Sequence, residues 1–146
     1  MMLSCDISNS EIEIMRILWA ESPLTSRSII DRMMAISDWK EGTIKSFISR
    51  LIQKNIIHKN SHTKPYLLSP LISYQEATFQ RIDNDLSPIC QKDRGKLLAH
   101  LIDEQALSQA DCQTLIDLLL AKKETAPAEV PCSCPPGQCQ CHHSHL

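Results

Sequence analysis

Apolar residues recur at intervals of three and four over three consecutive stretches near the start of the chain, a spacing that predicts amphipathic helices. The first helix follows a capping box at residues 8–11 and runs to about Ala20. The second starts at Thr25 or Ser26, and the third spans residues 43–55. Asn55 suits the C-cap position of that third helix.

Two short stretches that contain paired aliphatic residues follow, at residues 56–59 and 66–68, with a polar segment between them and Pro70 after them. This pattern predicts a β-hairpin. Three helices followed by a hairpin is the order of a winged helix-turn-helix domain. In that fold the third helix enters the major groove of DNA and the hairpin forms the wing. We therefore expect a mostly α chain that begins with such a domain.

The polar face of helix 43–55 carries small hydrogen-bonding and basic side chains and no carboxylate. Such side chains bond base edges and phosphates. The chain has a net charge of -2, yet between Lys40 and Lys64 it holds six cations against one anion, Glu41. The alternative is the solvated surface of a small helical domain. The candidate DNA contacts are Thr43, Lys45, Ser46, Ser49, Arg50 and Lys54 on the helix and Lys59 and Lys64 on the wing.

Three more helical stretches are expected at about 71–86, 91–104 and 108–123. Their apolar stripes would be poorly covered within one copy, which predicts a two-fold homodimer. A segment without periodicity that holds two prolines then predicts a linker. The expected divisions are a winged-helix domain at 1–70, a helical dimerisation region at 71–123, a linker at 124–131 and a Cys/His metal-binding tail at 132–146.

The tail carries two Cys-x-Cys pairs, Cys132 with Cys134 and Cys139 with Cys141. Residues 136–137, Pro-Gly, suit the centre of a type II turn that would fold one pair onto the other. Four converging thiolates suit tetrahedral Zn²⁺, and thiolates also select Cu(I). An iron–sulfur cluster is less favoured because it usually takes wider spacings. A tail without function is the remaining alternative.

The chain shows neither a signal peptide nor a long apolar run, so we expect a cytosolic protein without a membrane partner. A reducing cytosol favours metal ligation over disulfides. Cys5, Cys90 and Cys112 are isolated, and the last two fall in expected helical regions as small core residues. The three histidines after the tail cysteines are either further ligands or a polar end; they are His142, His143 and His145.

These motifs together resemble the BlaI/MecI/CopY family of winged-helix repressors. The resemblance rests on residues 7–19, Pro-Leu-Thr at 23–25, Trp39 and the run from Thr43 to Leu51, and it continues through Lys54 and Ile57 to Tyr66. The Cys-x-Cys-x4-Cys-x-Cys tail resembles the copper-responsive CopY branch. Gly42 departs from the pattern, because relatives often have Lys or another polar residue there.

The resemblance implies a homodimer that binds an inverted-repeat operator of TACA/TGTA type at copper-homeostasis genes. It also implies a Zn²⁺-bound form that represses and two Cu(I) ions per tail that displace zinc and release DNA. A copper chaperone would deliver the Cu(I).

The sequence is also compatible with two other functions. A repressor of the β-lactam-responsive type, inactivated by proteolysis, would not need the tail cysteines. A metal-buffering or metal-donating protein that does not bind DNA would not need the basic face of helix 43–55. Enzymatic activity has the least support, since the chain shows no Ser/His/Asp set, phosphate loop or paired carboxylates and has only three glycines.

Overall fold

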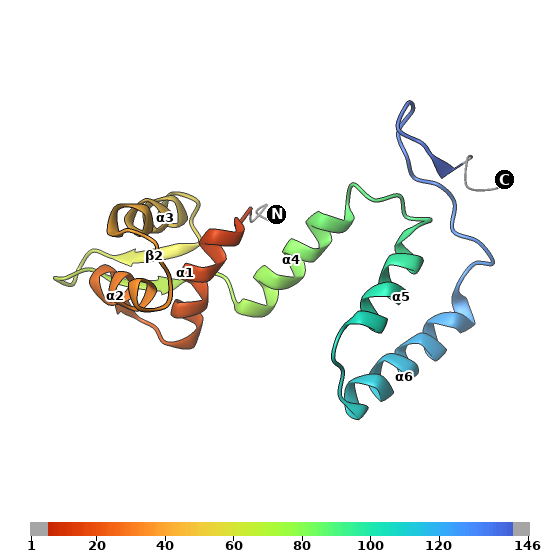
Figure 1. Ribbon diagram of the computed structural model, residues 1–146, viewed down its shortest axis with the longest axis horizontal. Coiled ribbons are helices and arrows are strands. Elements are labelled where there is room, and N and C mark those ends of the chain that lie inside the picture. Colours follow the sequence, from red (N-terminus) through yellow and green to blue (C-terminus); the bar gives the residue numbers. More distant parts are fainter. Residues whose placement is uncertain (1–5, 142–146) are drawn as a thin grey trace. The chain divides into compact units, whose positions relative to one another are not determined.

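The computed structural model describes residues 6–141 and divides into two units between Asn84 and Asp85 (Figure 1). The first unit contains α1 (Asn9–Ala20), β1 (Leu24–Thr25), α2 (Ser26–Ile36), α3 (Glu41–Gln53), β2 (Ile57–Asn60), β3 (Leu67–Pro70) and most of α4 (Tyr74–Leu86). The second contains α5 (Arg94–Glu104), α6 (Gln109–Thr125) and the tail. The predicted fold class is confirmed: a mostly helical chain with a small antiparallel sheet and a cysteine cluster near its C-terminal end.

Side-chain caps fix the starts of the first two helices. The Ser8 hydroxyl accepts a hydrogen bond from the Glu11 backbone N–H, and the Thr25 hydroxyl accepts one from Ser28, both at 3.1 Å. Both predicted starts are therefore confirmed. The Glu11 carboxylate, expected to reach back to the Ser8 backbone, instead accepts a hydrogen bond from the Ser8 hydroxyl and pairs with Lys54.

The bounds predicted for α3 were two residues too late at both ends. Lys40 occupies the N-cap position without a side-chain cap, so no sequence signal marks the start. Asn55 lies one residue beyond the C-cap and has a φ of 60°. The Asn55 N–H donates to Ile52 O at 3.1 Å and the Ile56 N–H to Leu51 O at 3.0 Å. This is a Schellman motif, which needs a left-handed residue that asparagine tolerates.

The sheet has the strand order β1-β3-β2, and both pairs are antiparallel. The β2–β3 hairpin pairs Ile57 with Pro70 and Asn60 with Leu67, so the predicted wing is present with strands one or two residues later than expected. Strand β1 was not predicted, because two residues are too few to show a period. Pairing of Leu24 with Leu68 ties the α1–α2 connection to the wing.

The core of the first unit is aliphatic and draws on every element. Residues 72–77, expected to belong to the dimerisation region, also pack on this unit. Ala77 is buried, and the Trp19 indole N–H donates to Ile72 O at 2.9 Å. The Trp19 and Tyr74 rings meet edge to face at 5.3 Å. The largest fully buried side chains are Ile14, Met15, Leu18, Ile29, Ile30, Met33, Ile44, Leu51, Ile57 and Leu68.

The second unit has little core of its own. Helix α6 begins with a capping box, Ser108 with Asp111, and its C-terminal end at Thr125 extends into the expected linker. Within α6, only Leu115 is not exposed. The exposed apolar side chains of this unit include Leu98, Leu101, Ile102, Leu107, Ile116, Leu118, Leu119 and Leu120. No helix within residues 6–141 is long and apolar enough to cross a membrane.

The tail makes the turn that its sequence predicts. Gly137 has a φ of 85°, and the Gln138 N–H donates to Pro135 O at 3.2 Å. Pro136 and Gly137 thus occupy the two central positions, and a type II turn requires a positive φ at the second of them.

Candidate nucleic-acid interface and candidate metal centre

Helix α3 presents one apolar and one polar face. Ile44, Ile48 and Leu51 are buried in the core, which fixes the rotation of the helix. The opposite side is left to solvent, as the helical period requires. All eight predicted DNA-contact residues are exposed: Thr43, Lys45, Ser46, Ser49, Arg50, Lys54, Lys59 and Lys64.

The α3 surface is less free of negative charge than expected, because the helix starts early enough to include Glu41. The Arg27 guanidinium donates a hydrogen bond to Glu41 and lowers the pKa of that carboxyl, which also lies 3.8 Å from Lys45 Nζ. The Arg50 guanidinium lies over the Phe47 ring, 5.7 Å from its centroid. Such stacking orients an arginine while leaving its N–H groups available for an acceptor.

Lys54 has partners within the protein. Its ammonium donates to both carboxylate oxygens of Glu11, at 3.0 and 2.9 Å, and to Asp6 O at 2.8 Å. Glu11 is only 3% exposed. Three acceptors match the three N–H donors of an ammonium group. Lys54 therefore joins the end of α3 to the start of α1 in this structure.

Lys59 and Lys64 lie on the wing. Lys59 Nζ stands over the Tyr66 ring at 4.3 Å from its centroid, which holds the cation at the surface of the hairpin. Contact of either lysine with DNA stays a prediction.

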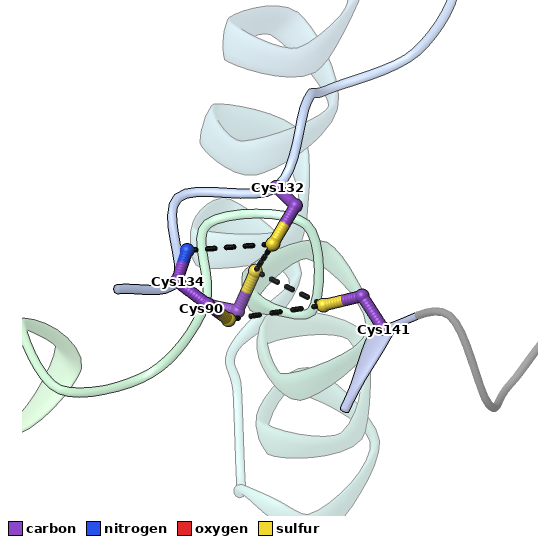
Figure 2. A group of neighbouring side chains, drawn as sticks. All are labelled: Cys90, Cys132, Cys134 and Cys141. Carbon is purple, nitrogen blue, oxygen red and sulfur yellow. Dashed lines mark hydrogen bonds between the residues drawn. The ribbon is translucent and has the colours of Figure 1, made fainter. Parts of the chain in front are cut away.

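Four cysteine sulfurs form a compact group in the second unit. The Sγ atoms of Cys90, Cys132, Cys134 and Cys141 all lie within 4.8 Å of one another (Figure 2). We call these four residues the thiol cluster. Cys139 borders it, with its Sγ 3.5 Å from Cys132 Sγ. No disulfide joins cysteines within residues 6–141. The turn thus brings three of the four predicted ligands together and places the fourth beside them.

Cys90 is the residue that sequence reasoning missed. It precedes α5 in an irregular segment, not in a helix, and its sulfur lies against Cys132 and Cys141, not in an apolar core. Spacing gives no signal, because 42 positions separate Cys90 from Cys132. The core position predicted for Cys112 was also wrong, since this side chain is exposed on α6. Cys5 and the three terminal histidines lie outside the described residues.

The thiols of the cluster differ in acidity, because their surroundings shift their pKa values in opposite directions. Backbone N–H groups of Ser133 and Lys92 lower the pKa of Cys90 to about 6. Hydrogen bonding to Cys132 raises the pKa of Cys134 to about 12, and contact with Cys90 raises that of Cys141. A thiol with a lowered pKa loses its proton more readily. Thiolates are the ligand form for soft and borderline metal ions.

The order of helices and strands, with an exposed polar helix before an antiparallel wing, defines a winged-helix DNA-binding protein. The family model for the penicillinase repressor matches residues 7–121. The chain belongs to the penicillinase repressor family and is a DNA-binding transcriptional repressor. This family consists of repressors, not enzymes. The matched residues include α3 and the wing but end before the tail cysteines.

Individual relatives agree with this assignment. An uncharacterized 16.5 kDa protein from the ptsI 3′ region of Latilactobacillus sakei is 35% identical over 136 residues, 93% of each chain. The methicillin resistance regulatory protein MecI of Staphylococcus aureus strain N315 is 24% identical over 80% of this chain and 95% of its own. The penicillinase repressor of Bacillus licheniformis is 20% identical, over 77% and 88%.

The solution structure of the DNA-binding domain of the repressor BlaI is also similar. It is 25% identical, with a TM-score of 0.47, and the match covers 52% of this chain and 93% of that one. The family-model match over residues 7–121 confirms the predicted family. The copper-responsive branch stays a prediction.

Proposed function

We propose that this protein is a copper-responsive repressor of copper-homeostasis genes. In the proposal a Zn²⁺-bound homodimer occupies an inverted-repeat operator, and Cu(I) displaces zinc and releases the DNA. The observation that carries the proposal is the convergence of four cysteine sulfurs within 4.8 Å of one another. The proposal places the protein in the cytosol with its operator, with a copper chaperone as the Cu(I) donor that the family resemblance implies.

The donor set suits both ions. Four thiolates match the tetrahedral preference of Zn²⁺, whereas Cu(I) is soft and accepts fewer sulfurs per ion. One Zn²⁺ or two Cu⁺ ions on four thiolates give the same total charge of about -2, because each thiolate carries a single negative charge. A change of net charge therefore does not account for release. The proposed signal is the change in coordination geometry when Cu(I) replaces Zn²⁺. The tail would change its conformation to fit the new geometry.

A homodimer gives the exposed apolar residues of α5 and α6 a partner. In proteins most helical stability comes from the packing of an apolar face and not from intrinsic helix propensity. Helix α6 has 17 residues and is exposed along almost its whole length. A second copy would cover its leucines and would hold two α3 helices at the spacing of an inverted repeat.

The test is operator binding, measured by fluorescence anisotropy on a duplex that carries a TACA/TGTA inverted repeat. Zinc-loaded wild type should bind this duplex, and Cu(I) should weaken its affinity at least about tenfold, a coupling ordinary for allostery. Cys132→Ser/Cys134→Ser should lose the copper effect, whereas Cys112→Ser, a matched change on α6, should keep it.

Two outcomes would contradict the proposal. Equal affinity with and without Cu(I) would reject copper sensing and favour the β-lactam type of signal, which the names of the MecI and penicillinase repressor relatives suggest. A copper effect that survives in Cys132→Ser/Cys134→Ser would place the sensor outside the tail.

A further inference from the structure

The thiol cluster contains one sulfur that the tail does not supply. Cys90 Sγ lies 3.6 Å from Cys132 Sγ and 3.4 Å from Cys141 Sγ, and the Cys90 side chain is buried (Figure 2). Cys90 belongs to the connection between α4 and α5. It therefore joins two segments that are far apart in sequence and that both lie in the second unit.

Contacts that involve no cysteine sulfur hold the same two segments together. The Gln91 backbone N–H donates to Ser133 Oγ at 3.0 Å, and the Gln91 side-chain amide donates to Pro131 O at 2.6 Å. The Cys90 carbonyl accepts a hydrogen bond from the Asp93 N–H at 2.9 Å, at the start of α5. Two hydrogen bonds from Gln91, the residue after Cys90, therefore hold Cys90 beside the tail.

Three of the six sulfur separations in the thiol cluster are close to those around a single tetrahedral ion, and all six are within 4.8 Å. Zn–S bonds of about 2.3 Å imply S···S edges of about 3.8 Å in a regular tetrahedron. The separations are 3.6 Å for Cys90–Cys132, 3.4 Å for Cys90–Cys141 and 3.9 Å for Cys134–Cys141. The described cysteines thus supply five neighbouring sulfurs for four ligand positions.

We propose that Cys90, Cys132, Cys134 and Cys141 are the four Zn²⁺ ligands and that Cys139 is the sulfur left over. This inference rests on the proposed function only in requiring that the tail bind metal. It changes what the metal does to the protein, because a tail-only site would leave α5 untouched. A site that includes Cys90 ties the tail to the N-terminal end of α5, where the helical part of the second unit begins.

The test is metal binding by the full chain with Co²⁺ as a spectroscopic probe for the Zn²⁺ site. Thiolate-to-cobalt charge-transfer intensity counts the bound sulfurs, and competition by Zn²⁺ gives the relative affinity. Cys139→Ser should retain the four-sulfur spectrum and a Zn²⁺ affinity close to wild type. Cys90→Ser/Cys139→Ser should lose one sulfur and at least 10- to 100-fold in affinity, the loss typical of removing even an outer partner of a metal site. Cys112→Ser is the matched control and should behave as wild type.

The outcomes separate this inference from the proposed function. A four-sulfur spectrum in wild type that falls to three sulfurs in Cys139→Ser would overturn the role of Cys90 and restore the four tail cysteines as ligands. An unchanged spectrum on adding Cys90→Ser to Cys139→Ser would overturn it as well. Failure of the wild type to bind Co²⁺ or Zn²⁺ would remove the metal site altogether, and with it the proposed function.

Discussion

Glu11 shows how a single residue can serve a helix cap and an ion pair at once. Its backbone N–H donates to Ser8 in the cap of α1, and its buried carboxylate receives two hydrogen bonds from Lys54. A buried carboxylate without its cation is costly, because it loses water and gains no compensating charge. The sequence indicated the cap but not the pair, since the two residues are 43 positions apart.

We predict that Lys54→Met destabilises the protein by about 1–3 kcal/mol, less than for a fully buried pair because the Lys54 side chain is partly exposed. Lys59→Met, on the exposed wing, should change stability by less than about 0.5 kcal/mol. Urea unfolding followed by circular dichroism gives both values. Equal stability of the two variants would show that the Glu11–Lys54 pair contributes nothing.

Among the exposed side chains of α3, Arg50 offers the most hydrogen-bond donors to DNA, because a guanidinium carries five N–H groups. We predict that Arg50→Ala weakens operator binding by about 1–3 kcal/mol with the fold intact, since one well-made contact from arginine to a base or clamped phosphate has that value. Gln53→Ala, one turn later on the same exposed side, is the control. Anisotropy titrations in which Arg50→Ala binds as tightly as wild type would reject this reading of the helix.

At the scale of elements, the start of a helix was predicted best where a side-chain cap marks it. Helices α1 and α2, which have a side-chain cap, start where their Ser or Thr predicted. Helix α3 has no such cap, and its predicted start was late. Apolar spacing alone indicates that a helix exists but does not fix its first residue, because the period continues unchanged across the end.

The end of α3 offers a direct test of its geometry. Asn55 has a positive φ, a conformation that alanine adopts at a cost of about 1–2 kcal/mol and glycine without strain. We predict that Asn55→Ala lowers the free energy of unfolding by about 1 kcal/mol, whereas Asn55→Gly leaves it unchanged or raises it slightly. Thermal unfolding of the two variants in parallel is the measurement. The opposite order would show that the Schellman motif is not what ends the helix.

At the scale of the whole molecule, a homodimer is predicted from the apolar side chains that α5 and α6 leave exposed. Removing everything after Pro70 would not test this cleanly, because Ile72 and Ala77 belong to the packing of the winged-helix unit. Substitutions on α6 leave that unit untouched. The sequence does not reveal that Cys90 belongs to the thiol cluster, since only folding brings Cys90 to the tail.

We predict that Ile116→Glu/Leu119→Glu gives a monomer, because two charges replace apolar side chains one turn apart on α6. Thr114→Glu adds the same carboxylate at a polar position and should stay dimeric. Sedimentation velocity at micromolar concentration distinguishes the two states. The monomer should also bind the operator at least about tenfold more weakly, since the α3 helices of two copies are no longer linked. A dimeric double variant would place the interface elsewhere.

The position of Cys90 also affects the entropy of the unfolded chain. A bond from Cys132 through a metal ion to Cys139 spans seven positions, whereas one to Cys90 spans 42 and encloses both α5 and α6. The entropy that such a bond removes from the unfolded ensemble grows with the logarithm of ring size. A bond that persists in the unfolded chain therefore stabilises the folded protein by about 1.6 kcal/mol more when it closes the larger ring. With Cys90 as a ligand, metal binding therefore makes the α5–α6 segment a closed ring, and loss of the ion opens it.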